Sequence, residues 1–584
     1  MNRIIPPQTE TRESVSPTAP PTGKYVPYHE RFPLTLPDRT WPDKQILAAP
    51  EWCSVDLRDG NQALPIPMTV EEKMGFFHVL KDLGFKQIEV GYPASGGKEK
   101  ELSDEYIFMR RLIEEKTNGR PNLEGIIPQV LTMDRPDLIK TTFESLRGAP
   151  GAIVHIYRPT SIDQRELFFT MTKDQVMQAA VDSTKLVRRL ANRSDFPVQL
   201  QFSPESFTGT EIDFAIDVCN AVVNAWDPGS HEKVILNIPA TVELSRPNLY
   251  ADRIEYFCRH LRRRENVIIS LHNHNDRGTA VAATELGIMA GGDRVEGTIF
   301  GNGERTGNLD IINLAVNLYK EGIDPKLDLR RLPDTIEQYE KYTKMQVPAR
   351  HVVGDLAFTA YSGGHQGPIA AGLRHQENPN NREWRVPYLG IDPSDLGISY
   401  DPIGLNSQSG KHGAMHNLKR VFGITVPKMM GNEVGAMMKT WTNTNKVDMP
   451  NETLWEVFKS TFIAPEGTLV LKDYTLAREG TKVKAFFEVS IAGKNTKAIT
   501  GTGNGPIDAA MSALKDVGYD FTVTDFQEHT RGKGSDAEAV AYVQVSNGET
   551  SIYGVGIDSN LEDAAVHALF AAANRLAPRM PDDK

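Results

Sequence analysis

The chain has 584 residues, of which 40% are hydrophobic and 24% are charged, a globular composition long enough for about two to four domains. A net charge of −11 argues against a nucleic-acid partner or an anionic membrane surface, although local arginines still permit small anionic substrates. No apolar run is long enough to cross a membrane, Met1–Pro20 lacks the apolar core of a secretory signal, and three cysteines form no disulfide framework, so we expect a cytoplasmic protein.

Residues 1–48 are rich in proline, threonine and charged residues and show no periodicity. This composition predicts a flexible N-terminal arm, which a partner subunit could order.

Short apolar or β-rich runs then alternate with helical segments as far as residue 301. Their spacing of roughly 27 to 46 residues from start to start suits repeated strand–helix units. Eight such units predict an α/β fold, a (β/α)₈ TIM barrel over residues 49–325; a doubly wound open sheet is the alternative. The eight runs are Trp52–Leu57, Gln87–Gly91, Gly125–Val130, Ala152–Tyr157, Val198–Phe202, Val234–Ile238, Val267–Leu271 and Arg294–Phe300.

Two further regions follow the predicted barrel. Residues 326–465 mix helical stretches with loops rich in glycine and proline, and we interpret them as small linker subdomains. Residues 466–584 contain a repeat: Gly501-Thr-Gly503 and Gly554-Val-Gly556 each follow a strand-like stretch and precede an alanine-rich helix. The repeat predicts two βββα-like units in an α+β, pseudo-symmetric C-terminal domain.

The predicted barrel strands end in polar motifs, and the carboxyl ends of barrel strands carry the chemistry of this fold. His272 and His274 are two residues apart on a strand, so their side chains project to one face. Asp59 follows the first strand, which neighbours the eighth in a closed barrel, and Asn308 offers an amide oxygen. This set predicts a divalent-metal site with open positions for a chelating substrate. The alternative is that His-x-His is only polar decoration of a loop.

Two more charged residues accompany the predicted metal site. Arg58 is either a surface ion pair or a fixed cation that stabilises developing enolate charge. Glu205 is either an ordinary strand-end carboxylate or, beside a metal-bound carbonyl, a proton handler.

These motifs resemble those of the aldol-type, metal-dependent barrel acyltransferases, a family that includes 2-isopropylmalate, homocitrate and citramalate synthases and 3-hydroxy-3-methylglutaryl-CoA lyase. The resemblance covers roughly residues 25–584 and is closest to the long, actinobacterial type of 2-isopropylmalate synthase. The motifs that carry it are Leu57-Arg58-Asp59-Gly60-Asn61-Gln62, Ser203–Glu211, Pro239–Glu243, His272-Asn-His274-Asn-Asp276, Gly301–Asn308, Ser362–Gln366 and Asn406–Lys411.

The resemblance implies a role for each matching residue. It implies that Asp59, His272 and His274 bind the metal, with Asn308 close to it or bound directly. It implies that Arg58 stabilises the enolate and that the 301–308 loop contacts acetyl-CoA. Proton transfer falls to Glu205, His365 and Tyr400, and the keto-acid pocket to His155, Ser203 and Thr241. The implied metal is Mg²⁺, with Mn²⁺ and Zn²⁺ as alternatives.

The activity that the resemblance implies is condensation of acetyl-CoA with 2-ketoisovalerate to 2-isopropylmalate. It also implies a homodimer, in which His365 and Tyr400 reach the neighbouring barrel, and inhibition by leucine bound near Asn504, Gly505 and Ile507 in a regulatory domain over 466–584. Two alternatives stay open: citramalate or homocitrate synthesis, and a non-catalytic, amino-acid-responsive binding protein.

Overall fold

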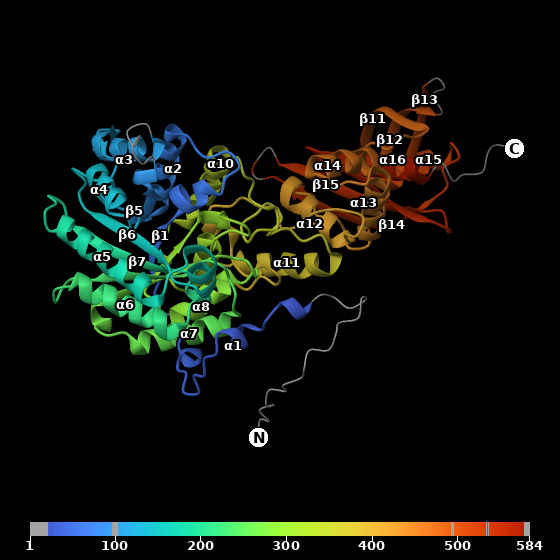
Figure 1. Ribbon diagram of the computed structural model, residues 1–584. Coiled ribbons are helices and arrows are strands. Elements are labelled where there is room, and N and C mark those ends of the chain that lie inside the picture. Colours follow the sequence, from blue (N-terminus) through green and yellow to red (C-terminus); the bar gives the residue numbers. More distant parts are fainter. Residues whose placement is uncertain (1–21, 96–102, 492–495, 533, 535–536, 577–584) are drawn as a thin grey trace. The chain divides into compact units, whose positions relative to one another are not determined.

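The structure is a computed structural model that describes residues 22–95, 103–491, 496–532, 534 and 537–576. It divides into two compact units (Figure 1). The first runs to Pro348 and includes Ser394–Ile398, and the second contains Ala349–Pro393 and the chain from Ser399 onward. Residues 1–21 of the predicted arm lie outside the described residues.

The first unit is a closed barrel of parallel strands in the order β1-β10-β9-β8-β7-β6-β5-β2, which confirms the predicted fold. The eight predicted runs correspond to its eight strands: β1 (Glu51–Ser54), β2 (Gln87–Gly91), β5 (Ile127–Met133), β6 (Ala152–Pro159), β7 (Val198–Glu205), β8 (Val234–Ala240), β9 (Val267–Asn273) and β10 (Arg294–Gly297). The first and last strands are shorter than the predicted runs, because the chain turns at the barrel mouth after each of them, at Asp56–Gly60 and at Ile299–Gly301.

Helices follow the strands around the barrel: α2 (Val70–Leu83), α3 (Asp104–Glu114), α4 (Pro136–Ser145), α5 (Lys173–Ala191), α6 (Ile212–Trp226), α7 (Pro247–His260), α8 (Ala280–Met289) and α9 (Ile311–Lys320). A small pair of strands, β3 (Lys116–Thr117) and β4 (Arg120–Pro121), follows α3. Local sequence sets the helix ends. At α2, Thr69 and Glu72 form a capping box, and Gly84 ends the helix at φ 117°.

The described part of the N-terminal arm packs on the barrel of its own chain, which corrects the prediction of a flexible arm. The segment includes α1 (Tyr28–Arg31) and a short turn at Trp41–Asp43. Trp41 is 7% exposed, and its indole Nε1 donates to Asp252 on α7 at 2.8 Å. The backbone N–H of Thr40 donates to Glu255 at 3.0 Å. These partners lie far along the chain, so sequence periodicity could not reveal them.

The barrel unit extends beyond the predicted boundary at residue 325. Helix α10 (Leu332–Thr343) packs on α2, where Phe76 lies 6.2 Å from Tyr339 and 6.1 Å from Tyr342 between ring centroids. The second unit begins with α11 (Gly363–Gln376), α12 (Lys411–Phe422), α13 (Gly431–Asn445) and α14 (Asn451–Phe458).

The C-terminal repeat is two βββα units, as predicted. The first is β11 (Leu469–Glu479), β12 (Lys482–Ile491), β13 (Lys497–Gly503) and α15 (Pro506–Lys515). The second is β14 (Thr522–Arg531), β15 (Glu538–Ser546), β16 (Ser551–Asp558) and α16 (Leu561–Leu576). Each unit has an antiparallel three-stranded sheet in chain order, and one apolar core runs through both.

The repeat glycines let each helix lie close on its sheet. A Cβ on Gly501 would come 2.0 Å from Ala509 O in α15, and one on Gly556 would come 2.0 Å from Ala564 O in α16. Gly501 and Gly556 therefore occupy equivalent positions in the two units. The sequence pattern instead aligns Gly501 with Gly554, two residues earlier. Side chains alternate between the two faces of a strand, so shifting the alignment by two residues leaves each glycine on the same face. The glycine pattern alone therefore could not distinguish the two alignments.

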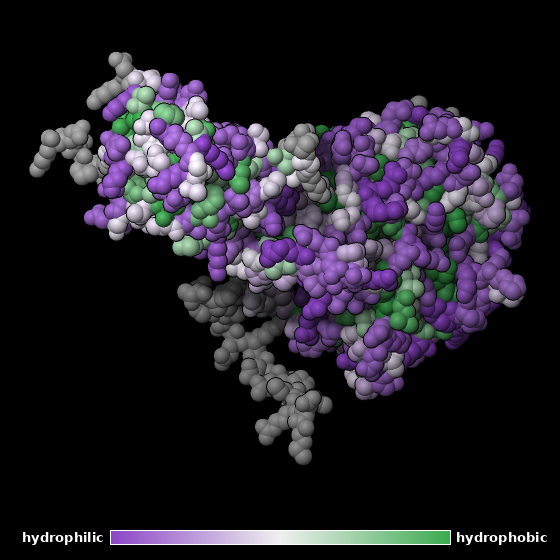
Figure 2. All heavy atoms as spheres, turned by 180° about the vertical axis from the view of Figure 1, so that it is seen from behind, coloured by the Kyte–Doolittle hydropathy of each residue, from purple (hydrophilic) through white to green (hydrophobic). Residues whose placement is uncertain are grey.

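The described residues contain no helix that is long and apolar enough to cross a membrane. The face drawn in Figure 2 is mostly hydrophilic, with hydrophobic side chains scattered over it.

Candidate active site

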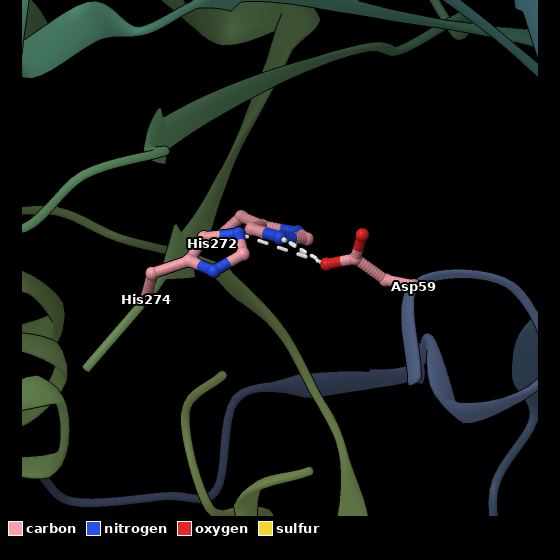
Figure 3. Close-up of side chains that lie close together, drawn as sticks. All are labelled: Asp59, His272 and His274. Carbon is pink, nitrogen blue, oxygen red and sulfur yellow. Dashed lines mark ion pairs between the residues drawn. The ribbon is translucent and has the colours of Figure 1, made fainter. Parts of the chain in front are cut away.

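Three predicted metal ligands meet at the carboxyl ends of β1 and β9 (Figure 3). Asp59 Oδ2 lies 3.3 Å from Nε2 of His272 and 3.7 Å from Nε2 of His274. One ligand atom from each residue lies within 4.8 Å of the others, and all three side chains are buried. Asn308 is also buried and donates from Nδ2 to Asp59 Oδ2 at 2.9 Å. The structure thus brings the four residues together.

The donor set fits a divalent cation. His274 Nδ1 and Asn308 Oδ1 are buried and have no hydrogen-bond partner among the described residues. Burial and the neighbouring His272 lower the pKa of His274 to about 4, which keeps that imidazole neutral. Burial opposes ionisation of Asp59, but Arg58 and His272 hold its pKa well below the usual range. Burial opposes protonation of His272, but Asp59 and Glu296 raise its pKa to about 9, so a bound cation would replace the proton on its Nε2. Neutral imidazole and ionised carboxylate are the forms that bind Mg²⁺, Mn²⁺ or Zn²⁺.

The turn after β1 places Arg58 and Asp59. The carbonyl of Val55 accepts from the backbone N–H of Asp59 at 2.8 Å and of Gly60 at 3.1 Å, so the chain doubles back at the mouth. Asp56 ties this turn to the one after β10: it accepts from Ser54 Oγ at 2.7 Å and from the backbone N–H of Ile299 at 3.2 Å. Burial raises the pKa of Asp56 to about 7. Asp56 directly precedes the Leu57–Gln62 motif, but its position in the sequence did not indicate this contact.

Arg58 bridges two carboxylates. Its Nη1 donates to Asp59 and its Nε donates to Glu89 on β2. The arginine side chain is 12% exposed and Glu89 is fully buried, so this is not a surface ion pair. Glu89 was not among the predicted site residues; the available signal was a single carboxylate inside the predicted strand Gln87–Gly91.

Glu89 also orients the predicted keto-acid residues. His155 Nδ1 lies 2.7 Å from Glu89 Oε2, and His155 Nε2 lies 2.7 Å from Ser203 Oγ. Asn237, another residue that the sequence did not single out, donates to the same Ser203 Oγ at 3.0 Å. Thr241 Oγ1 accepts from the backbone N–H of Ser206 at 3.0 Å, directly after Glu205.

A cavity of about 290 Å³ joins these groups at the barrel mouth. Burial raises the pKa of Glu205, which suits a group that exchanges protons. A larger hollow of about 600 Å³ lies at the opposite ends of the strands, but its lining is mainly apolar and holds none of the predicted catalytic residues. The mouth cavity is lined by Arg58, Asp59, Gln62, Leu131, His155, Tyr157, Ser203, Glu205, Asn237, Pro239, Thr241, His272, His274, Glu304 and Arg305.

Two predicted proton-transfer residues belong to the second unit. The exposed His365 lies in the first turn of α11 and stacks on Tyr388 at 4.0 Å between ring centroids. Tyr400 is half-buried and packs edge-on against Phe358 at 6.1 Å, and burial raises its pKa.

The predicted regulatory residues lie at the start of α15. Gly505 and Ile507 line an apolar hollow of about 460 Å³, together with Val523 and Phe526 of β14 and Leu561 of α16. Asn504 is not among its lining residues; its backbone N–H donates to Asp508 at 2.9 Å.

A closed parallel barrel with a buried Asp–His–His cluster at its mouth defines a barrel enzyme with a candidate metal site, and residues 49–338 match the HMGL-like family model. Residues 355–419 match the post-catalytic domain of alpha-isopropylmalate synthase, and residues 448–577 match the LeuA allosteric (dimerisation) domain.

Curated relatives match almost the whole chain. The 2-isopropylmalate synthase of Clostridium acetobutylicum is 45% identical, covering 95% of this chain and 99% of its own. That of Helicobacter hepaticus is 44% identical over 93% of this chain and 98% of its own. That of Rhodospirillum rubrum is 44% identical over 96% and 99%. The chain belongs to the 2-isopropylmalate synthase family, which confirms the predicted resemblance.

Proposed function

We propose that this chain condenses acetyl-CoA with 3-methyl-2-oxobutanoate (2-ketoisovalerate) and water to give 2-isopropylmalate and CoA, the first committed step of leucine biosynthesis. The observation that carries the proposal is the buried cluster of Asp59, His272 and His274 beside Arg58 and Glu205 in one cavity. Family membership supports the substrates and a cytoplasmic location.

The cavity suits a 2-keto acid with an apolar side chain. Leu131, Tyr157 and Pro239 supply apolar lining beside the hydroxyl and imidazole groups. A substrate with a second carboxylate would need a further cation. The two arginines of the described lining already have partners: Arg58 holds Asp59 and Glu89, and Arg305 holds Asp276 at 2.8 Å. This favours 2-ketoisovalerate over 2-oxoglutarate.

We assign the steps of the reaction to the chain's own residues. A divalent cation, Mg²⁺ in our proposal, would be held by Asp59, His272 and His274 near Asn308 and would polarise the keto carbonyl. His155, Ser203 and Thr241 orient the keto acid. Glu205, with its raised pKa, belongs to the proton-transfer set with His365 and Tyr400.

The acetyl methyl group loses a proton to that set, and Arg58 stabilises the enolate oxygen that results. The enolate carbon then forms the new bond to the keto carbon, whose oxygen takes a proton. Hydrolysis of the thioester releases CoA and makes the sequence irreversible. The 301–308 loop, which includes the cavity residue Glu304, supplies the acetyl-CoA side.

We further propose that leucine binds in the apolar hollow at Gly505 and Ile507 and inhibits from there, in a homodimer. The hollow offers the backbone N–H groups at the start of α15 and the apolar side chains of Val523 and Phe526. A site in the C-terminal domain acts through two states of the enzyme, so inhibition need not compete with the keto acid.

Two measurements test the proposal. CoA release by the purified protein should be fastest with 2-ketoisovalerate in a panel that includes pyruvate and 2-oxoglutarate. Preference for pyruvate or 2-oxoglutarate would make the chain a citramalate- or homocitrate-forming enzyme, and no turnover with any keto acid would leave a binding protein. Calorimetry of leucine with the full chain should show binding that an Ile507→Asp substitution removes.

A further inference from the structure

A carboxylate next to the proposed metal site has no part in the steps above. Glu296 lies on β10, and the strand register places it directly beside His272 on β9. Both Glu296 and Arg294, two residues earlier on the same strand, are 0% exposed. A charged pair taken fully out of water is costly to build, so its contacts indicate what it does.

Glu296 uses its two carboxylate oxygens for different purposes. Oε2 lies 2.8 Å from His272 Nδ1. Oε1 accepts from Arg294 Nη1 at 2.7 Å, and two barrel glutamines also donate to it: Gln201 at 2.7 Å and Gln129 at 2.9 Å. Three donors thus fix one oxygen, and the other oxygen faces a single imidazole.

The second nitrogen of that imidazole faces the metal cluster. His272 Nε2 lies 3.3 Å from Asp59 Oδ2, on the side of the ring away from Glu296. A neutral imidazole that donates Nδ1–H to a carboxylate has its lone pair on Nε2, and that lone pair is what binds a metal ion.

We propose that Glu296 is a positioning residue of the metal centre: it selects the tautomer and the ring orientation of His272, and Arg294 holds Glu296 in place. This inference rests on the proposed metal site and extends it to residues that no step of the reaction uses. Arg294 is itself fixed, because it also donates to Gln87 at 2.6 Å, Ser270 at 2.8 Å and Gln129 at 2.7 Å.

The substitution Glu296→Gln tests the tautomer directly. The three donors at Oε1 would hold the amide oxygen of the new side chain, which turns its NH₂ group toward His272. Nδ1 would then have to accept that hydrogen bond, and the proton would move to Nε2, where it blocks metal binding. We expect the affinity for Mn²⁺, measured by calorimetry on the metal-free full chain, to fall about 10- to 100-fold.

A second readout separates positioning from a loss of stability. Turnover by the Glu296→Gln variant should recover in part as Mn²⁺ is raised, because the defect lies in metal affinity. Glu255→Gln is the matched control: Glu255 is a buried carboxylate at the barrel exterior, 3% exposed, that accepts from Thr40 and Arg259. It should leave Mn²⁺ affinity unchanged.

Each outcome decides the inference. Wild-type Mn²⁺ affinity in folded Glu296→Gln would overturn it. If that variant does not fold, Glu296→Asp takes its place: it keeps the charge beside Arg294 but draws the carboxylate away from His272, so a loss of Mn²⁺ affinity of 10-fold or more is expected and an unchanged affinity refutes the role. A wild-type chain that binds no Mn²⁺ would instead refute the proposed metal site, so the two failures are distinguishable.

Discussion

Replacing Arg58 by lysine should slow turnover sharply while the chain stays folded. The guanidinium uses two different nitrogens at once, Nη1 for Asp59 and Nε for Glu89. A lysine ammonium has one nitrogen on a flexible stem and lacks the planar, forked geometry of the guanidinium. One of the two buried carboxylates would lose its hydrogen bond from the cation, and the cation would lose the fixed place from which it stabilises the enolate.

The contacts set the size of the effect. A hydrogen bond to a charged group is worth about 1.5 to 3 kcal/mol, and each 1.36 kcal/mol at the transition state changes the rate about tenfold. Loss of one such bond to a buried carboxylate, together with the displaced charge, should lower kcat by about 10²-fold.

The assay is steady-state CoA release at saturating 2-ketoisovalerate, acetyl-CoA and Mn²⁺. Arg277→Lys is the matched control, since Arg277 is an exposed arginine in the loop after β9, and it should keep kcat within about twofold. If Arg58→Lys changes kcat only a few-fold while the control behaves as expected, then Arg58 is structural and the assignment fails.

Further outcomes follow from the same structure. His274→Ala should abolish turnover and weaken Mn²⁺ binding without loss of the fold, and near-normal metal-dependent activity would show that the cluster is misassigned. Burial raises the pKa of Glu205 above its ordinary 4.5, so its protonated form persists to higher pH. If Glu205 accepts a proton in the reaction, kcat/KM should fall with decreasing pH along a limb centred above pH 4.5. A limb at or below pH 4.5 contradicts this proton-transfer role. Gly501→Ala places a Cβ 2.0 Å from Ala509 O and should destabilise the C-terminal domain by about 1–3 kcal/mol in calorimetric melting, whereas the exposed Thr502→Ala should not; equal melting refutes the close approach. Mixing His365→Ala chains with His272→Ala chains should restore part of the activity if His365 serves the barrel of the partner chain, and absence of rescue after verified subunit exchange would mean that it does not.

The barrel was predictable from sequence because its signal is local and repeated. Strands of a parallel barrel are buried on both faces and appear as continuous apolar runs between helices. All eight runs became strands, and Asp59, Arg58, His272 and His274 could be placed at the mouth because they follow such runs. The duplicated βββα unit was visible for the same reason.

Residues whose roles depend on lateral contacts were not predictable. Glu89 and Glu296 stand inside strands, and only the closed strand order and register bring one against Arg58 and the other against His272. The sequence shows a carboxylate within each predicted strand, but it does not show which side chain that carboxylate contacts.

The same physical reason explains two of the corrections. Trp41 is buried against α7, where it donates to Asp252. The composition of the arm predicted flexibility because Asp252 lies 211 residues away in sequence and leaves no local signal. The glycine repeats gave a pattern that fits either of two alignments two residues apart, and helix–sheet packing chose Gly501 with Gly556. The sequence by itself determined the strands, helices, repeat and strand-end motifs; tertiary structure decided which distant side chains meet, because those contacts depend on strand register and on packing between elements far apart in the chain.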